Sequence, residues 1–153
     1  MTDPGHYCGS CHCGAIAVEI TTSSAVKIMQ PRACQCSFCR RHGARTVADP
    51  QARATITAPD SNAITRYKFA RKTADFLICA TCGTYIAALI QDGNAARSTI
   101  NVNGLGIDAL RTREPQPVSY DGETVDERIA RRKQRWMPTE LIFGPQTAEP
   151  AAN

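Results

Sequence analysis

The sequence has no long hydrophobic run, no strong excess of charge and few aromatic residues. Its longest purely apolar run spans only residues 86–90, whereas a helix needs about 20 apolar residues to cross a bilayer. Its 18 lysines and arginines against 14 acidic residues give a formal charge of +4, which is too small to argue for binding to nucleic acid. The sequence also starts without a basic segment followed by an apolar one, the mark of a secretory signal. We therefore expect a cytoplasmic protein that contacts no membrane.

Cysteine is the unusual component of an otherwise ordinary composition. With 42% hydrophobic and 21% charged residues over 153 positions, the chain is the size and type of one globular domain, and not a disordered chain, a collagen or a coiled coil. The eight cysteines fall into three tight groups, all before residue 83. An even number of cysteines can form a disulfide framework, but such frameworks belong to short secreted chains.

The spacing of the cysteines predicts metal binding. A single residue separates the cysteines in Cys11-His12-Cys13 and in Cys34-Gln35-Cys36. This spacing strains a local disulfide but lets two thiolates converge on one ion. Sites made only of sulfur select zinc or an iron–sulfur centre, and none of the spacings matches a ferredoxin run. Zinc is therefore the expected metal.

The cysteines divide most simply into a closed site and an open one. The segment CATCG at 79–83 is a knuckle that supplies half of a four-cysteine site. Cys11 and Cys13 are its natural complement, because CQCSFC at 34–39 already holds three ligands. Four cysteines close a structural site, whereas three protein ligands leave a fourth position for water or substrate, as in a catalytic zinc site.

Cys8 leaves alternatives open. It can share the structural ion with Cys11, close the three-cysteine site as its fourth ligand, or be a spare thiol. The spare thiol is favoured because the two Cys-x-Cys turns mirror each other. His12 and His42 are further candidate ligands, and a solvent-facing position is the favoured interpretation for both.

Three segments carry the paired cysteines in a distinctive order: GSCHCG at 9–14, CQCSFCRRHGA at 34–44 and CATCG at 79–83. INVNGL at 100–105 and YDG at 120–122 follow them. In the order and separation of these motifs, residues 7–136 resemble the glutathione-dependent formaldehyde-activating enzyme and centromere protein V family.

The resemblance implies a mainly β, zinc-bound fold of several coiled sheets, of the mammalian-suppressor-of-Sec-like type, as one domain over residues 1–143. It implies two zinc ions: a structural ion on Cys11, Cys13, Cys79 and Cys82, and a catalytic ion on Cys34, Cys36 and Cys39. The implied activity is that of a carbon–sulfur lyase, which joins glutathione and formaldehyde, or a related small aldehyde, into S-hydroxymethylglutathione or its analogue. The centromere protein branch implies an alternative, a non-catalytic zinc module that binds a protein or nucleic acid.

Glutathione has two carboxylates and one ammonium group, so its pocket should present cationic or N–H partners. Arg40 and Arg41 directly follow the three-cysteine segment. We expect them to bind the substrate, with surface ion pairing as the competing role.

Alternation of apolar and other side chains predicts a half-buried strand at 14–21. Further strands are expected at 53–57, 64–69, 75–79, 84–90 and 97–102. A short helix should start with Ser37 as its N-cap. The Gly-Pro and Glu-Pro pairs near the end of the chain predict a flexible tail at 144–153.

Thr124 and Glu127 have the spacing of a capping box, which predicts a short C-terminal helix over 124–136. This helix is rich in basic residues, and a solvated face on a docked helix is favoured over a binding surface as their role. They are Arg128, Arg131, Arg132, Lys133 and Arg135.

Overall fold

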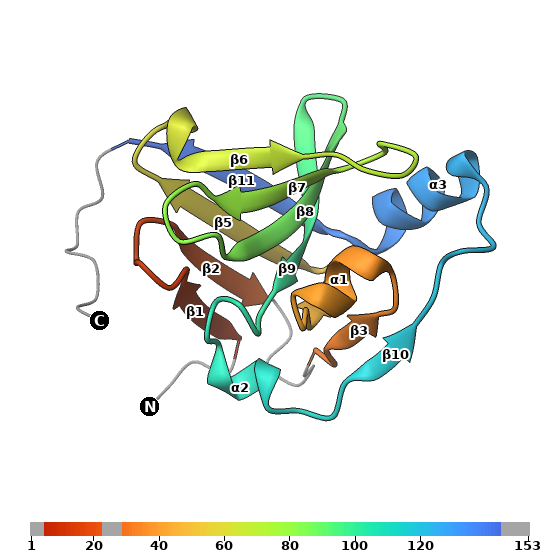
Figure 1. The fold of residues 1–153 in the computed structure, drawn as a ribbon, viewed down its shortest axis with the longest axis horizontal. Helices are drawn as coiled ribbons and strands as arrows, with labels where there is room; N and C mark the ends of the chain where they lie inside the picture. Colours follow the sequence, from red (N-terminus) through yellow and green to blue (C-terminus); the bar gives the residue numbers. More distant parts are fainter. Residues whose placement is uncertain (1–4, 23–28, 145–153) are drawn as a thin grey trace.

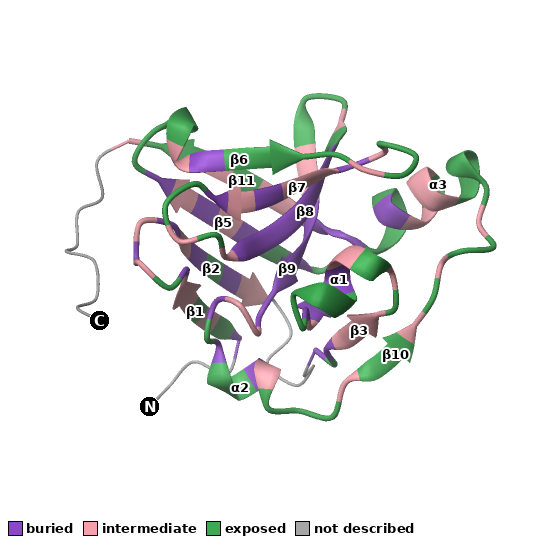
Figure 2. Ribbon diagram, viewed as in Figure 1, coloured by how far each residue is buried: buried purple, intermediate pink, exposed green. Residues whose placement is uncertain are grey.

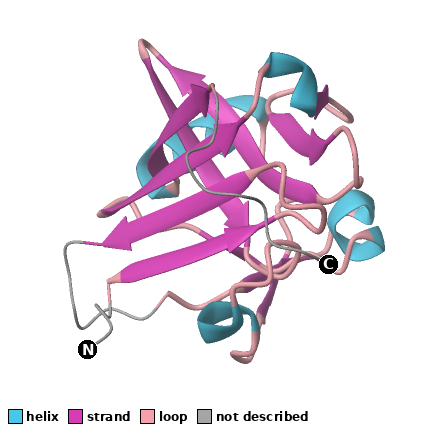
Figure 3. Cartoon of the chain, turned by 90° about the vertical axis from the view of Figure 1, so that its left-hand side faces the viewer, coloured by secondary structure: helices cyan, strands magenta, loops and turns pink. Residues whose placement is uncertain are grey.

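The computed structural model describes residues 5–22 and 29–144 and confirms a mainly β fold with a short C-terminal helix. The expected tail at 144–153 lies outside this part of the chain, except for Gly144. Figure 3 shows that the helices are short and scattered around the strands. In chain order, the strands are β1 (His6–Ser10), β2 (Ala17–Thr22), β3 (Arg32–Cys34), β4 (Thr46–Val47), β5 (Ala52–Ala58), β6 (Ile64–Tyr67), β7 (Asp75–Cys79), β8 (Tyr85–Asp92), β9 (Ala95–Asn101), β10 (Gln116–Val118) and β11 (Met137–Phe143). The helices are α1 (Ser37–Arg41), α2 (Asp108–Arg111) and α3 (Val125–Arg135), and a 3-10 turn, η1, spans Ser61–Ala63.

These strands form one connected network of hydrogen bonds. The main path runs β1-β2-β5-β11-β9-β4-β3-β10, and β8, β7 and β6 branch from it at β9. The branch arises because one edge of β9 pairs with β8, while the other pairs first with β11 near Ser98 and then with β4 near Ile100. The several sheets expected from the sequence are thus parts of one branched sheet. It is mixed, since β11 runs parallel to β5 and β10 parallel to β3.

The core lies around β8, whose residues 85–90 are all buried. Its neighbour β9 is buried from Ser98 onward, and β5 buries every second residue. Figure 2 shows this buried band crossing the centre of the molecule. The continuous apolar run at 86–90 is therefore a central strand covered on both faces, as such runs commonly are.

The predicted strands are found, with shifts at their ends. The strands expected at 53–57, 64–69, 75–79, 84–90 and 97–102 correspond to β5 through β9. The strand expected at 14–21 begins only at Ala17, because Gly14 adopts a φ of 84° and its N–H donates to the Cys11 carbonyl oxygen at 3.0 Å. Glycine tolerates this left-handed conformation, so the chain turns there before the strand starts.

Of the two helices predicted from the sequence, one starts at a different residue from the one expected. The N-cap of α1 is Cys36 and not Ser37, since the Cys39 N–H donates to the Cys36 sulfur at 3.4 Å. The prediction for α3 is confirmed. Thr124 caps it, and Thr124 and Glu127 exchange both bonds of a capping box.

β3, α1, β10 and α3 gather at one side of the molecule, on the right in Figure 1. α1 follows β3 after two residues, and β10 pairs with β3 in parallel, matching Val118 with Cys34. The segment after β10 leads into α3, so residues far apart in the chain share this region. Among the described helices, none is long and apolar enough to span a membrane.

Candidate metal centres and the adjoining cavity

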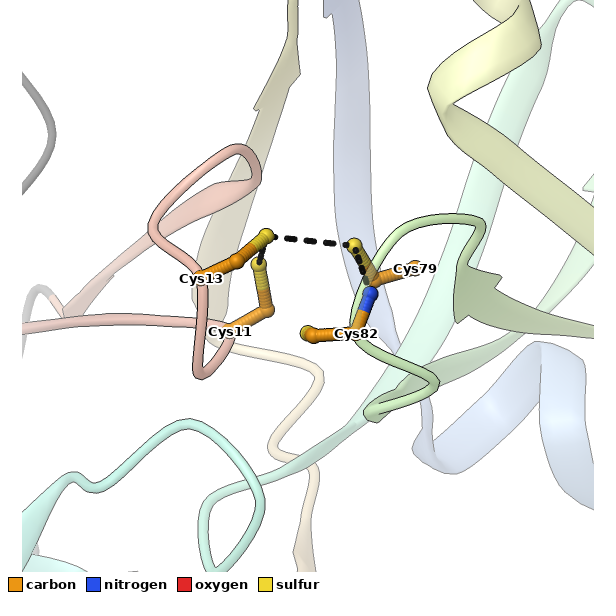
Figure 4. Close-up of side chains that lie close together, drawn as sticks. All are labelled: Cys11, Cys13, Cys79 and Cys82. Atoms are coloured by element: carbon orange, nitrogen blue, oxygen red, sulfur yellow. Dashed lines mark hydrogen bonds between the residues drawn. The ribbon is translucent and has the colours of Figure 1, made fainter. Parts of the chain in front are cut away.

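Two loops bring four cysteines together, as Figure 4 shows. Cys11 and Cys13 come from the loop between β1 and β2, while Cys79 ends β7 and Cys82 lies in the turn before β8. The Cys11 and Cys13 sulfurs are 3.7 Å apart, as are those of Cys13 and Cys79. All four sulfurs lie within 4.8 Å of one another. We call Cys11, Cys13, Cys79 and Cys82 the four-cysteine group.

The geometry of the four-cysteine group fits a tetrahedral zinc ion. Four sulfurs placed about 2.3 Å from one ion lie about 3.8 Å apart, close to the 3.7 Å separations found here. These separations are too long for a disulfide. Backbone N–H groups also point at the sulfurs, since Ile16 N donates to Cys11 Sγ at 3.3 Å and Cys82 N to Cys79 Sγ at 3.5 Å. Burial raises the pKa of Cys11 to about 12, so a cation is needed to hold it as a thiolate.

A second group consists of Cys34, Cys36 and Cys39, whose sulfurs also lie within 4.8 Å of one another. Cys34 ends β3, Cys36 caps α1 and Cys39 lies within α1. The β3 end and the first turn of α1 therefore aim three sulfurs at one point. We call these residues the three-cysteine group. Within the described ranges, no fourth cysteine, histidine or acidic residue joins it.

The three thiols of this group cannot all ionise unaided. Hydrogen bonds from the Cys34 and Cys39 thiols lower the pKa of Cys36, while the same contacts raise the pKa values of Cys34 and Cys39. Cys36 is thus the thiol of this group that loses its proton most readily. A full set of thiolates requires a positive ion between them, which is the chemistry of a zinc ligand set.

Cys8 joins neither cysteine group. It is exposed and lies in a separate cluster with His6 and Glu19. The interpretation of Cys8 as a thiol outside both predicted zinc sites therefore agrees with the structure. His12 and His42 are also exposed, as expected, and the ring of His42 lies 4.4 Å from that of Phe38.

The three-cysteine group lines a cavity, which offers about 100 Å³ to the centres of water molecules. Aromatic side chains form much of its wall: Phe69, Phe76, Tyr85, Tyr120 and Trp136. Phe38 and Tyr67 stack on this wall, with ring centroids 5.3 and 5.5 Å from that of Phe69. Nearly all of the few aromatic residues are therefore gathered here, and the remaining two are Tyr7 and Phe143. Such an apolar wall excludes water and strengthens electrostatic interactions inside.

Arginines from α3 line the same cavity, which overturns the prediction of a fully solvated basic face. Arg128, Arg131 and Arg132 are cavity residues, whereas Lys133 and Arg135 are exposed as expected. Arg131 is held by two hydrogen bonds to Glu123, at 2.8 and 3.1 Å, and its guanidinium lies 3.5 Å from the Tyr120 ring centre. The hydrogen bond from Arg131 lowers the pKa of Glu123 and keeps it ionised.

Arg132 is the most buried of these arginines, with a relative exposure of 7%. Its Nη1 donates to the Thr73 hydroxyl at 2.7 Å, but its Nε has no hydrogen-bond partner and no acidic side chain of the described segments pairs with it. Burial, together with Arg131 and Arg128, lowers its pKa to about 10. The charge of Glu123 acts on Arg132 only from a distance, and a buried cation without a directly paired carboxylate favours an anion in the cavity.

Arg40 and Arg41, the substrate-binding residues predicted from the sequence, are exposed on α1 and are not part of the cavity wall. Their role in binding stays a prediction. The sequence signal for the cavity arginines was their helical spacing. Residues 128, 131 and 132 fall on one helical face together with the buried Trp136. The sequence offered no sign that this face meets the three-cysteine group.

The region of the chain that matches a known protein family includes both cysteine groups. A family model described as glutathione-dependent formaldehyde-activating enzyme matches residues 6–120. The match ends before α3, which supplies the cavity arginines. A crystal structure of a Rhodobacter sphaeroides protein is 28% identical in sequence, with a TM-score of 0.50, and the match covers 74% of this chain and 99% of that one. The match to the family model extends over most of the sequence, and the chain therefore belongs to the glutathione-dependent formaldehyde-activating enzyme family.

Proposed function

We propose that the protein is a zinc-dependent carbon–sulfur lyase of the S-hydroxymethylglutathione synthase type. It joins glutathione to formaldehyde or a related small aldehyde. The observation that carries this proposal is the three-cysteine group, which lacks a fourth ligand among the described residues and lies in the wall of a cavity that also contains a buried, unpaired Arg132.

Cys34, Cys36 and Cys39 would hold a zinc ion and leave one coordination position toward the cavity. When bound, zinc lowers the pKa of a thiol and so supplies a thiolate at neutral pH. The three cysteines are ligands in this proposal and not nucleophiles. The four-cysteine group would hold the second zinc ion and cross-link the β1–β2 loop to the β7–β8 turn.

The cavity would bind and orient the substrates. Its aromatic wall keeps water away from a reactive thiolate, and Arg132 attracts a carboxylate of the thiol substrate by a charge-assisted hydrogen bond. Arg128 and Arg131 are partly neutralised by Glu123, so Arg132 is the strongest candidate for this contact. Asp121 also lines the cavity and is a potential partner for the ammonium group of glutathione.

The cavity is small, at about 100 Å³, compared with roughly 300–1,000 Å³ for typical ligand pockets. This size fits the reacting sulfur and a small aldehyde, with the rest of the tripeptide at the opening. In the reaction, a carbon–sulfur bond forms between the thiol sulfur and the carbonyl carbon. The proton of the thiol ends on the former carbonyl oxygen, so the step needs no oxidant or reductant.

The alternative is a non-catalytic zinc module that binds a protein or nucleic acid through the basic face at 128–135, and Cys8 as a fourth ligand of the second ion would favour it. Cys8 lies in a different cluster, which favours an open site and hence the catalytic proposal. A role for Arg40 and Arg41 at the cavity opening and a cytoplasmic location stay predictions.

The test is the rate at which the zinc-loaded protein interconverts formaldehyde, glutathione and their adduct, measured by NMR exchange spectroscopy. The reaction also runs without a catalyst, so the rate is compared with the same mixture lacking protein. We expect acceleration by the wild type and by Cys8→Ser, but none by Cys36→Ser. Wild-type protein with two bound zinc ions and no acceleration for formaldehyde or any of a panel of small aldehydes would refute the proposal.

A further inference from the structure

We propose that His6, Cys8 and Glu19 form a third cation site, which binds a divalent transition-metal ion such as Zn²⁺ on the outer surface of the β1–β2 pair. The site is separate from both cysteine groups, and the proposal does not rest on the proposed enzymatic function. Its ligands would be one imidazole nitrogen, one thiolate and one carboxylate oxygen, with water in the remaining position.

The β-sheet register creates this cluster. Side chains two residues apart in a strand share a face, so His6 and Cys8 project from the same side of β1. Glu19 on β2 is the direct cross-strand partner of Cys8, and side chains in such positions are close neighbours. Tyr7, between His6 and Cys8, instead packs against the core. The backbone therefore fixes three donor groups on one outward face.

The distances in this cluster match those expected of metal ligands. The Cys8 sulfur lies 3.5 Å from His6 Nε2, and His6 Nε2 lies 3.2 Å from the Glu19 Oε2 atom. Tetrahedral zinc with ordinary bond lengths would separate sulfur from nitrogen by about 3.5 Å and nitrogen from oxygen by about 3.4 Å. The three donor atoms all lie within 4.8 Å of one another, so small side-chain adjustments suffice for binding.

The donor set indicates the class of cation. Imidazole and thiolate ligands suit zinc, cobalt, nickel and copper, whereas magnesium and calcium prefer sites made of oxygen. The site is also open to solvent, with side-chain exposures of 39% for His6 and 53% for Glu19. A cation can therefore reach it without any opening of the fold.

A cation would also relieve a local conflict of charge. Cys8 has a raised pKa, because its thiol, although exposed, is partly shielded from water by its neighbours and because of the negative charge of Glu19. A cation placed between the two groups stabilises both anionic forms. Binding must displace the cysteine proton and the existing His6–Glu19 contact, so the site should be weaker than the buried four-cysteine group.

Bound metal would link the edge strand β1 to β2, just before the loop that carries Cys11 and Cys13. β1 is at the end of the sheet path and pairs with β2 alone among the described strands. A cross-link there would hold one half of the four-cysteine group in register.

The experiment titrates protein that carries two equivalents of Zn²⁺, enough to fill only the two cysteine groups, with Co²⁺, whose thiolate charge-transfer absorption reports a bound sulfur. Wild type is compared with Cys8→Ser, His6→Ala and Glu19→Gln. Glu140→Gln serves as a matched control, since Glu140 is an exposed strand carboxylate outside the cluster. We expect one additional equivalent of Co²⁺ in wild type and in Glu140→Gln. The additional absorption should vanish in Cys8→Ser, and binding should weaken at least tenfold in His6→Ala and Glu19→Gln.

A second readout follows Cys8 itself. All eight cysteines belong to the described part of the chain, and Cys8 alone is exposed. Its alkylation by iodoacetamide, quantified by peptide mass spectrometry, should be slowed by added Zn²⁺ in wild type but not in His6→Ala. Absence of an additional equivalent in wild type, its persistence in Cys8→Ser, or equal alkylation with and without Zn²⁺ would overturn the proposal.

Discussion

The Cys13 and Cys79 sulfurs lie 3.7 Å apart although the two residues are 66 positions apart in the chain. This contact joins the loop after the edge strand β1 to the turn that leads into the central strand β8. A zinc ion in the four-cysteine group would therefore hold together two parts of the sheet that share no strand pairing.

Replacing a ligand in each cysteine group should have different effects. Cys82→Ser should lower the free energy of unfolding by about 4 kcal/mol or more, as expected when a structural metal site is lost. Cys36→Ser should abolish turnover while the protein stays folded. Chemical denaturation followed by circular dichroism, together with zinc content, tests both, and Glu140→Gln, outside all three ligand clusters, is the control. If both variants lose stability equally, the second ion is structural as well.

Arg132→Gln should raise the KM for glutathione about tenfold or more, with a smaller effect on kcat, because a charge-assisted hydrogen bond contributes about 1.5–3 kcal/mol. Lys133→Gln removes an exposed charge from the same helix and should leave KM unchanged. Arg40→Ala and Arg41→Ala measure the contribution expected of those residues from the sequence. An unchanged KM in Arg132→Gln would remove this residue from the binding site.

The Glu123 carboxylate should make stability depend on pH in the acidic range. Its pKa is lower in the folded protein than the ordinary value of a glutamate, so the unfolded chain binds more protons and stability rises with pH. The contribution is fully present above about pH 4.5 and is lost as the pH falls through the folded-state pKa. Metal ligands also titrate in acid, so the measured quantity is the difference in unfolding free energy between wild type and Glu123→Gln. This difference should be about 1 kcal/mol at pH 7 and shrink in acid; a difference that does not vary with pH would contradict the assignment.

Gly9→Ala should destabilise the protein by about 1–3 kcal/mol, the usual cost of overpacking. A Cβ atom at this position would clash with the Leu105 carbonyl oxygen and would lie 2.6 Å from Ile107 Cγ1. Gly122→Ala is a suitable control, because its Cβ would meet no atom within 4 Å. Thermal unfolding of the two variants tests the prediction, and equal melting temperatures would show that β1 can move away from Leu105 without loss.

Local sequence patterns predicted the strands and helices that depend on near neighbours. Ile16, Val18 and Ile20 are fully or almost fully buried, as their alternation indicated, and the capping box of α3 is present. Strands β1, β3, β4, β10 and β11 were not predicted. They are short or are held by distant partners, as in the parallel pairing of Leu141 with Ile56. The alternation of apolar and polar residues along a segment does not show which distant strand it pairs with.

Only those parts of the candidate site that depend on the spacing of residues along the sequence could be predicted. The intervals between cysteines favoured the four-cysteine and three-cysteine groups that the structure contains, and they left open only the place of Cys8. The cavity arginines could not be predicted, because a basic helix face has the same pattern whether it meets solvent or a cavity. The burial of Arg132 also depends on Thr73, which accepts its hydrogen bond from 59 positions away in the chain, and the helix pattern cannot reveal such a partner. The cluster around Cys8 likewise depends on strand register, which pairs it with Glu19.

The position of β11 has a consequence for biosynthesis. The last described strand of the chain lies between β5 and β9 in the middle of the sheet path. A nascent chain that has not yet released residues 137–143 from the ribosome exit tunnel lacks the strand that joins these two, so the earlier strands cannot complete the sheet. Final assembly must therefore follow translation of residues 137–143, and premature termination before Met137 leaves β5 and β9 with unpaired edges that are prone to aggregation.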